Sequence, residues 1–472
     1  MGILGKIKKS KTIKAGLGYT IGNYLIKGVS FLALPLFSRL MSVEEFGAYN
    51  VYIGYTEILT ILIGLALHSS LKNAKYKYQE KLNSYLSCIV LLPVVLMLVF
   101  ISFGNLLFDW LSPVLNMNRI TLNILVIHSF ASAVFILYNA KLSLDYRYKS
   151  YLVLSTINCL GDLLLSVILM FTILNSDHYL ARVIGTALPL VLLSVYILIT
   201  FFISAKPTFN KEYYWFSLKY SIPVIPHGLS QVVLASSDKI MIENYLGKTE
   251  AGLYSFGSNV AGIVRVTTLS LDNVYGPWFY DQINQENYSK VKKFSSIYII
   301  MMCAFISLII LLVPEIVFIA GGDKYSSSVY AVIPSVTSMF FTFLYTLPST
   351  VEYFYGKTWI IAASSVFSAI LNIILNLIFI PRYGYIAAVY TTLVSYIIYF
   401  LIHYLAAYIL TRKWFFSNIA VLASALVILC VNFLTVWLAE QLIPRLVLAS
   451  VVVILMILFV IHFVKMRRGN NA

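Results

Sequence analysis

Charged residues are scarce in this chain of 472 residues: they make up 11% of it, whereas 60% of its residues are hydrophobic. Soluble domains carry about 25% charged residues. The composition therefore excludes a soluble globular enzyme, and its high hydrophobicity excludes a disordered chain. In a soluble protein the net charge of +15 would suggest a nucleic-acid partner. In so apolar a chain the first question is instead which side of a membrane the cations occupy.

Recognisable motifs for chemistry are also missing. The four cysteines lie in apolar runs without CxxC spacing, and the sequence contains neither HExxH nor two aspartates at i and i+2. Gly247-Lys248-Thr249 resembles the end of a P-loop, but Ile242 stands where the leading glycine is needed, and Gly356-Lys357-Thr358 fails in the same way at Val351. We therefore expect no disulfide framework, bound metal, ATP site or other cofactor, and a transporter rather than an enzyme.

Long apolar runs fill most of the chain. Since one membrane-spanning helix needs about 20 apolar residues, the hydrophobic content suffices for about fourteen spans. We predict an all-α integral membrane protein with spans near residues 16–38, 48–69, 83–107, 120–140, 151–174, 181–204, 220–246, 252–275, 294–313, 327–349, 358–380, 385–410, 418–439 and 444–464.

The distribution of Lys and Arg predicts the orientation. With the N-terminus inside, cytoplasmic segments hold 24 of these 34 residues and outside segments seven, namely Arg39, Arg119, Arg182, Lys248, Lys324, Arg382 and Arg445. Because short cytoplasmic loops retain positive charge, we expect both termini in the cytoplasm. This asymmetry also explains the basic composition without a nucleic-acid partner.

An internal repeat indicates two lobes. Glu45, Gly47 and Tyr49 recur as Glu250, Gly252 and Tyr254, and the stretch 179–186 is echoed by 385–392 at almost the same offset. An even number of spans per repeat gives two parallel six-helix lobes, with a substrate path between them. The predicted organisation is a basic N-terminus (1–15), a first lobe (16–204), a linker (205–219), a second lobe (220–410), two peripheral helices (418–464) and a tail (465–472).

Charged residues within the spans are the candidate functional residues, because a charge near mid-bilayer costs about 2.5–3.5 kcal/mol and needs a partner or a cavity. We predict that Lys27 and Arg265 bind an anionic substrate in a central cavity; Lys27 could instead pair with Glu57 or Asp162. Lys239 and Glu243, at i and i+4, are expected to form a structural ion pair. Residues for coupling or gating are Asp162, Asp238, Glu57 and Asp272, and those for a hinge are Pro223, Pro226 and Gly228.

Several stretches carry a family resemblance: Ser221–Ser230, Ser236–Ile242 and Gly247–Tyr254, then Asp272–Tyr280, Gly321–Tyr325 and Leu371–Gly384. Together they resemble the polysaccharide-transporter branch of the multidrug/oligosaccharidyl-lipid/polysaccharide exporter superfamily. That family usually has Arg after the aspartate at Asp238, where this chain has Lys239, which keeps the charge but loses bidentate geometry.

The resemblance implies a flippase. Members of this branch are understood to move undecaprenyl-pyrophosphate-linked oligosaccharide repeat units across the bacterial plasma membrane for capsule, exopolysaccharide or O-antigen synthesis. The implied partners are that lipid-linked oligosaccharide, membrane lipid, and a polysaccharide polymerase with chain-length proteins. A proton and a sodium ion are both candidates for the coupling ion.

Three alternative functions stay open. A cation-coupled exporter of small drugs would need a cavity dominated by acids, whereas this chain places Lys27 and Arg265 among its acids. A membrane polysaccharide polymerase or ligase would need a large outside loop, and the predicted loops are short. A peptidoglycan-precursor flippase is less compatible with the stretch 221–230.

Overall fold

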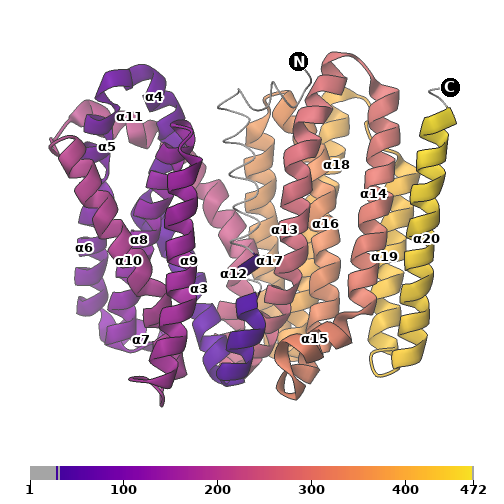
Figure 1. The fold of residues 1–472 in the computed structure, drawn as a ribbon, viewed down its shortest axis with the longest axis horizontal. Coiled ribbons are helices and arrows are strands. Elements are labelled where there is room, and N and C mark those ends of the chain that lie inside the picture. The colour runs from indigo at the N-terminus through magenta and orange to yellow at the C-terminus, as the bar shows by residue number, and fades with distance from the viewer. Residues whose placement is uncertain (1–27, 30–31, 470–472) are drawn as a thin grey trace. The chain divides into compact units, whose positions relative to one another are not determined.

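The computed structural model describes residues 28–29 and 32–469, and throughout these residues the regular secondary structure is helical, without a strand. The chain divides into two compact units, Met1–Asn244 and Tyr245–Ala472 (Figure 1). The predicted all-helical class is confirmed.

The first unit begins, after a short helical stretch at 32–40, with long helices joined by short ones. Their bounds are α3 Val43–Gly64, η1 Leu67–Ser70, α4 Leu71–Tyr78, η2 Gln79–Lys81, α5 Leu82–Ile89, α6 Leu91–Leu106, α7 Phe108–Leu115, α8 Arg119–Leu144, α9 Tyr148–Phe171, α10 His178–Ser204, α11 Lys211–Ser221, η3 Ile222–Val224 and α12 Ile225–Leu246. Within this unit α10 packs against both α8 and α9.

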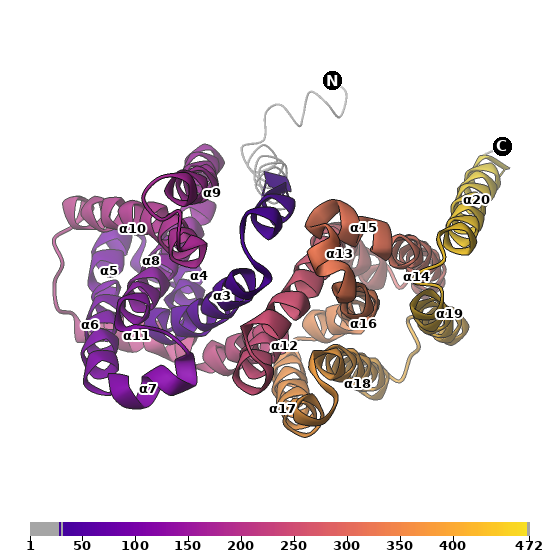
Figure 2. The ribbon, with the colours of Figure 1, turned by 90° about the horizontal axis from the view of Figure 1, so that it is seen from below.

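The second unit is built around α16, which packs against α13 and α18; Figure 2 shows α16 between these two helices. The helices of this unit are α13 Lys248–Asn284, α14 Tyr288–Leu311, α15 Val313–Gly321, η4 Asp323–Ser328, α16 Val329–Phe354, α17 Thr358–Tyr383, α18 Tyr385–Thr411, α19 Asn418–Trp437 and α20 Leu442–Gly469.

Local sequence explains where several helices begin. Ser42 and Glu45 form a capping box at the start of α3, in which each side chain accepts a hydrogen bond from the other residue's backbone N–H. The side chains of Asn118 and Asp177 likewise accept hydrogen bonds from backbone N–H groups at the starts of α8 and α10. In the repeat, Glu250 occupies the third position of α13, as Glu45 does in α3. The repeated Glu-x-Gly-x-Tyr motif thus opens a helix in each unit.

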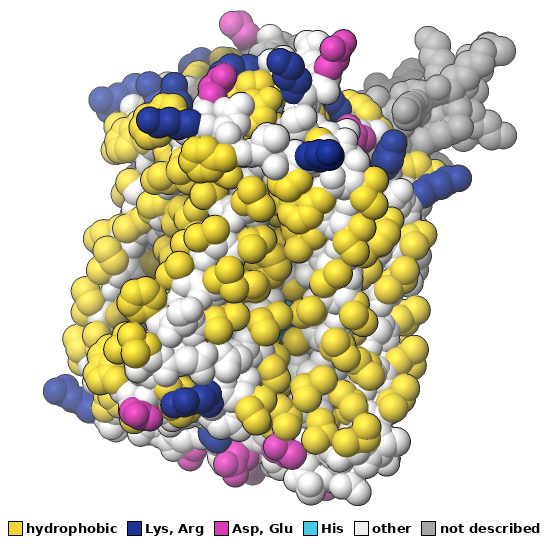
Figure 3. Space-filling view, turned by 90° about the vertical axis from the view of Figure 1, so that its left-hand side faces the viewer, with side chains coloured by type: hydrophobic (Ala, Val, Ile, Leu, Met, Phe, Trp, Pro, Cys, Tyr) yellow, Lys and Arg dark blue, Asp and Glu magenta, His cyan; other side chains and the backbone are white. Residues whose placement is uncertain are grey.

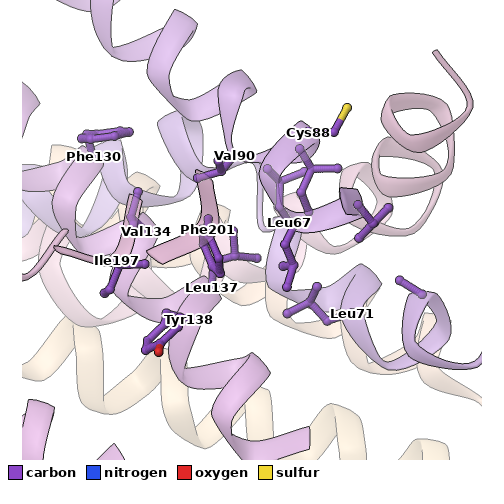
Figure 4. Close-up of a cluster of buried hydrophobic side chains, with 14 of the residues drawn as sticks. Leu67, Leu71, Cys88, Val90, Phe130, Val134, Leu137, Tyr138, Ile197 and Phe201 are labelled. Carbon is purple, nitrogen blue, oxygen red and sulfur yellow. The ribbon is translucent and has the colours of Figure 1, made fainter. Parts of the chain in front are cut away.

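The core of the first unit is a continuous apolar cluster (Figure 4). Phe130, Val134 and Leu137 of α8 pack with Ile197 and Phe201 of α10, and all are at most 5% exposed. Large apolar side chains also cover the outside of the molecule, for example Leu164 and Ile168 of α9. Figure 3 shows such side chains between two ends that carry the charged residues. This pattern fits helices embedded in lipid.

Ten helical segments in the described part of the chain are long and apolar enough to cross a membrane. The chain is therefore a multi-pass membrane protein, while the number fourteen stays a prediction. The first predicted span, 16–38, falls largely outside the described residues. The predicted spans 48–69, 220–246 and 252–275 correspond to α3, α12 and α13, which are long but too polar to be counted among the ten.

The two units divide after Asn244, helix α11 begins within the expected linker 205–219, and the predicted domain bounds stay a prediction. The structure differs from the sequence-based expectations at two places. Helix α13 continues to Asn284, beyond the expected end at residue 275. Arg182 and Arg445, assigned above to outside segments, are buried ion-pair partners within α10 and α20. The asymmetry of the remaining cations is unaffected.

Candidate functional site

Most predicted site residues lie on three long helices that are unusually polar. Helix α3 carries Glu57, α12 carries Asp238, Lys239 and Glu243, and α13 carries Arg265 and Asp272. Lys27 lies outside the described residues. Asp238 and Glu243 are buried, whereas Glu57 and Arg265 are exposed at the surface of their own units.

A polar contact joins α3 to α12 within the first unit. The Ser236 hydroxyl donates a hydrogen bond to a carboxylate oxygen of Glu57 at 2.6 Å. One turn earlier on α3, Gly54 leaves room for the Lys239 side chain, since a Cβ at position 54 would lie 3.0 Å from Lys239 Cε. Lys239 interacts electrostatically with Glu57 first and with Asp238 second.

The ion pairs among the described residues do not include Lys239 with Glu243. The two residues are one turn apart on α12, as expected, and Lys239 lies over Gly54 of α3. Their pairing, which would contribute only about 0.2–0.5 kcal/mol, stays a prediction.

A second polar network joins α9 to α10. The Arg182 guanidinium forms an ion pair with the Asp162 carboxylate and donates a hydrogen bond to the Ser166 hydroxyl at 2.8 Å. The Thr186 hydroxyl donates to Asp162 at 2.8 Å, and Tyr49 of α3 bonds to Thr186 at 2.9 Å. Asp162 of α9 is therefore held by two side chains of α10, and the network extends to Tyr49 of α3.

Aromatic rings cover the Arg182 guanidinium. Its central carbon lies 3.8 Å from the ring centroid of Phe37 and 4.7 Å from that of Tyr49. Gly185, one turn further along α10, allows the helices to approach this closely, because a Cβ there would lie 2.6 Å from the Cα of Ser166. The predicted coupling residue Asp162 is thus part of a tightly packed ion-pair site.

The second unit repeats this arrangement without charges. Asn372 stands at the same position in α17 as Asp162 does in α9, counted from the start of each helix. Its amide donates to the Thr392 hydroxyl of α18 at 3.1 Å, whereas Asp162 accepts from the Thr186 hydroxyl of α10. Asn376, one turn on, bonds to both Asn372 and Thr391. Equivalent helix pairs in the two units are therefore joined by equivalent polar bridges.

Asp272 and Arg265 are placed on α13 beside α16 of the same unit. The Thr346 hydroxyl donates to Asp272 at 3.0 Å. Tyr345, the preceding residue, interacts electrostatically with both Arg265 and Asp272. The structure thus brings this acid and this base near one tyrosine, although they are two turns apart on their helix.

The predicted hinge residues lie at the junction of two helices. Pro223 is in the short 3-10 turn η3, and Pro226 and Gly228 are in the first turn of α12. Proline cannot donate a backbone hydrogen bond, so the chain between α11 and α12 is interrupted where the sequence predicted. Movement at this junction stays a prediction.

Two functional candidates escaped sequence analysis. Arg182 was counted only among the outside cations, and the buried pair of Glu352 and His403 joins residues on α16 and α18. The sequence signal that could have identified His403 is the presence of a histidine inside an apolar span. Glu352 stands three residues beyond the predicted end of its span. Among the described residues, no group of three or more His, Cys, Asp or Glu side chains could hold a metal ion.

Comparisons with known proteins identify the family. Residues 13–282 match the family described as polysaccharide biosynthesis proteins. Protein 1 of the Lsg locus of Haemophilus influenzae is 22% identical over 387 residues, which are 77% of this chain and 90% of that protein.

Solved structures show the fold. The lipid II flippase MurJ in an inward closed conformation matches with a TM-score of 0.74 and 15% identity, over 95% of this chain and 98% of MurJ. An inward-facing multidrug resistance transporter of the MATE family matches with a TM-score of 0.63 and 12% identity, over 81% of this chain and 98% of its own. Because the family match covers more than half of its length, the chain belongs to the polysaccharide biosynthesis protein family.

Proposed function

We propose that this protein flips undecaprenyl-pyrophosphate-linked oligosaccharides from the inner to the outer leaflet of the bacterial plasma membrane. Family membership supports a role in polysaccharide biosynthesis. The fold, shared with a lipid II flippase and with MATE transporters, supports transport of a substrate with a polar head.

The observation that carries the proposal is the polarity of α3, α12 and α13. Each is long enough to span a bilayer, at 22, 22 and 37 residues, yet none is apolar enough to be among the ten candidate spans of the described chain. A charged side chain facing hydrocarbon is costly. Glu57 and Arg265 are exposed on these helices, and we infer that they face a water-containing path.

Such a path solves the physical problem of moving a sugar headgroup. A pyrophosphate and its sugars cannot enter hydrocarbon without losing their hydrogen bonds to water. Polar groups along the path replace that water, while the polyprenyl tail stays in the surrounding lipid. We propose that Arg265 binds the pyrophosphate through charge-assisted hydrogen bonds, together with Lys27.

The remaining predicted residues have proposed roles in the transport cycle. Asp162, Asp238, Glu57 and Asp272 would couple or gate the movement, and the junction at Pro223, Pro226 and Gly228 would serve as the hinge. The excess of Lys and Arg in alternate loops supports cytoplasmic termini.

Export of small cations, coupled to an ion, is the second candidate function. The hydrogen bond from Thr346 to Asp272 favours it, because a membrane-embedded acid of this kind can bind a cation. Deletion of the gene separates the two. A flippase deletion leaves lipid-linked oligosaccharide on the cytoplasmic side and removes the surface polysaccharide, whereas an exporter deletion sensitises cells to cationic compounds and leaves the polysaccharide intact.

A further inference from the structure

A carboxylate and an imidazole are completely buried together in the second unit. Glu352 of α16 and His403 of α18 both have 0% side-chain exposure. Nδ1 of His403 lies 2.9 Å from each of the two carboxylate oxygens of Glu352. Both residues fall within candidate membrane spans, where an ionisable pair marks a functional site more often than a structural one.

The other ring nitrogen of the same histidine has no hydrogen-bond partner. Nε2 of His403 is buried and unpaired among the described residues, which is rare for a buried polar atom. If Nδ1 donates to the carboxylate, Nε2 carries a free lone pair. That lone pair is a proton acceptor.

One proton therefore switches the charge of the pair. With Nε2 bare, the pair consists of a carboxylate and a neutral imidazole and carries a charge of about −1. When a proton from water adds to Nε2, an N–H bond forms and the pair becomes a neutral carboxylate–imidazolium ion pair. Histidine suits this role because it changes charge near neutral pH.

The surroundings stabilise the neutral form. Tyr345 stacks on the His403 ring at 5.7 Å between centroids, and Tyr399 packs edge-on at 4.7 Å. Tyr353 of α16 interacts electrostatically with Glu352. Tyr345, which contacts the His403 ring, interacts in turn with Tyr353, with Tyr396 of α18, and with Arg265 and Asp272 of α13. A single uncompensated negative charge in such a site is costly. Loss of the proton would therefore favour a conformation in which water reaches the pair.

Contacts also connect the Glu352–His403 pair to the candidate residues on α13. Tyr345 touches the His403 ring and interacts electrostatically with Arg265 and Asp272. Pro348 lies one turn before Glu352 and removes a backbone hydrogen bond of α16, so this part of the helix can bend. The charge of the pair is thus linked to the helices that carry the proposed substrate-binding residue.

We propose that Glu352 and His403 form a proton-binding site and that a proton is the coupling ion of this transporter. The inference rests on the proposed function, since a coupling proton requires a transport cycle to drive. Protonation would stabilise the conformation in which the pair is buried, as here, and deprotonation one in which water reaches it, so that a proton gradient biases the cycle.

The test uses the full chain reconstituted in proteoliposomes containing undecaprenyl-pyrophosphate-linked oligosaccharide, with and without an imposed pH gradient. We expect the gradient to accelerate flipping by the wild-type protein, and E352Q and H403Q to lose this acceleration while keeping gradient-free flipping. E315Q is the matched control, because Glu315 also pairs with a buried basic side chain, but with the guanidinium of Arg445 rather than with an imidazole. E315Q should respond to the gradient as the wild type does.

An unchanged gradient response in both E352Q and H403Q would overturn the proposal. Should one variant fail to elute as a monodisperse protein, the other carries the test, since each removes one member of the pair. A substrate-independent readout separates this inference from the proposed function. In ¹⁵N-histidine spectra of the wild-type protein, assigned with H403Q, the His403 signal should shift from a bare to a protonated nitrogen as the pH falls. A His403 signal that never titrates would contradict the inference even if flipping occurs; titration without flipping would contradict only the proposed function.

Discussion

The guanidinium of Arg182 on α10 and the carboxylate of Asp162 on α9 form an ion pair beneath the rings of Phe37 and Tyr49. The Arg182 side chain is 9% exposed and that of Asp162 is 27% exposed. The same carboxylate accepts a hydrogen bond from Thr186. This relationship fixes the α9–α10 pair, and its uncharged counterpart, Asn372 with Thr392, fixes α17 with α18.

Removing one partner of this pair should destabilise the protein. Breaking a buried ion pair costs about 3–5 kcal/mol, and because Asp162 is partly exposed we expect about 2 kcal/mol for Arg182→Ala. Thermal unfolding in detergent measures the effect. Asp162→Asn combined with Arg182→Ala should cost less than the sum of the single changes, whereas strictly additive effects would show that the two residues do not interact.

A methyl group at position 185 should disrupt the same contact. In Gly185→Ala the new Cβ would meet the backbone of Ser166, and overpacking of this kind costs about 1–3 kcal/mol. Gly262→Ala is the matched control, because nothing lies within 4 Å of a Cβ at that helical position. Unfolding midpoints of the two variants provide the comparison, and equal midpoints would refute the proposed close approach of α9 and α10.

Loss of the cation at position 265 should impair export. A hydrogen bond to a charged group contributes about 1.5–3 kcal/mol, so Arg265→Ala should lower the flipping rate roughly 10- to 100-fold. Arg265→Lys should retain part of the rate, because the charge remains but the bidentate geometry is lost. Lys290→Ala, at an exposed site at the start of α14, serves as the control. Wild-type export by Arg265→Ala at equal expression would remove Arg265 from the substrate path.

Acid should loosen α11 from α4 at one end of the first unit. The Lys77 ammonium donates a hydrogen bond to Glu212 at 2.8 Å, and this bond, followed by that from Tyr78, lowers the pKa of the Glu212 carboxyl. Because the pKa of Glu212 is lower in the folded protein than in the unfolded chain, the contact contributes its full stability above the ordinary carboxyl pKa of about 4.3. That contribution to stability is lost as the pH falls through the lowered pKa of Glu212.

Hydrogen exchange of the α11 backbone amides measures this response. In the wild-type protein the protection factors of these amides should fall as the pH passes through the lowered pKa of Glu212. In Glu212→Gln they should already be lower at neutral pH and should depend less on acid. The same acid response in both proteins would place its origin elsewhere.

The helices were largely predictable from the sequence because apolar runs and capping residues are local signals. The predicted span 358–380 corresponds to α17, Thr358–Tyr383, and the predicted span 385–410 to α18, Tyr385–Thr411. Helix α13 was underestimated, since Asp272 and Pro277 resemble the end of a span. A proline inside a membrane helix is tolerated when neighbouring groups satisfy the backbone.

The partners of the charged residues were not predictable, because they depend on packing between helices. Lys239 and Glu243 are neighbours along one helix face, yet Lys239 packs over Gly54 of α3 and interacts electrostatically with Glu57. Glu352 and His403 are 51 residues apart and meet only because α16 packs against α18. The sequence identified which residues are unusual within the membrane, but the fold determines which of them meet.

The most direct test of the proposed function is flipping in proteoliposomes made from pure lipids, the purified full chain and undecaprenyl-pyrophosphate-linked oligosaccharide. A membrane-impermeant glycosidase or lectin outside the vesicles reports which headgroups are accessible. We predict that the accessible fraction rises toward completeness with the wild-type protein and that Arg265→Ala slows this rise. An accessible fraction that stays the same as in protein-free vesicles would contradict the proposed function.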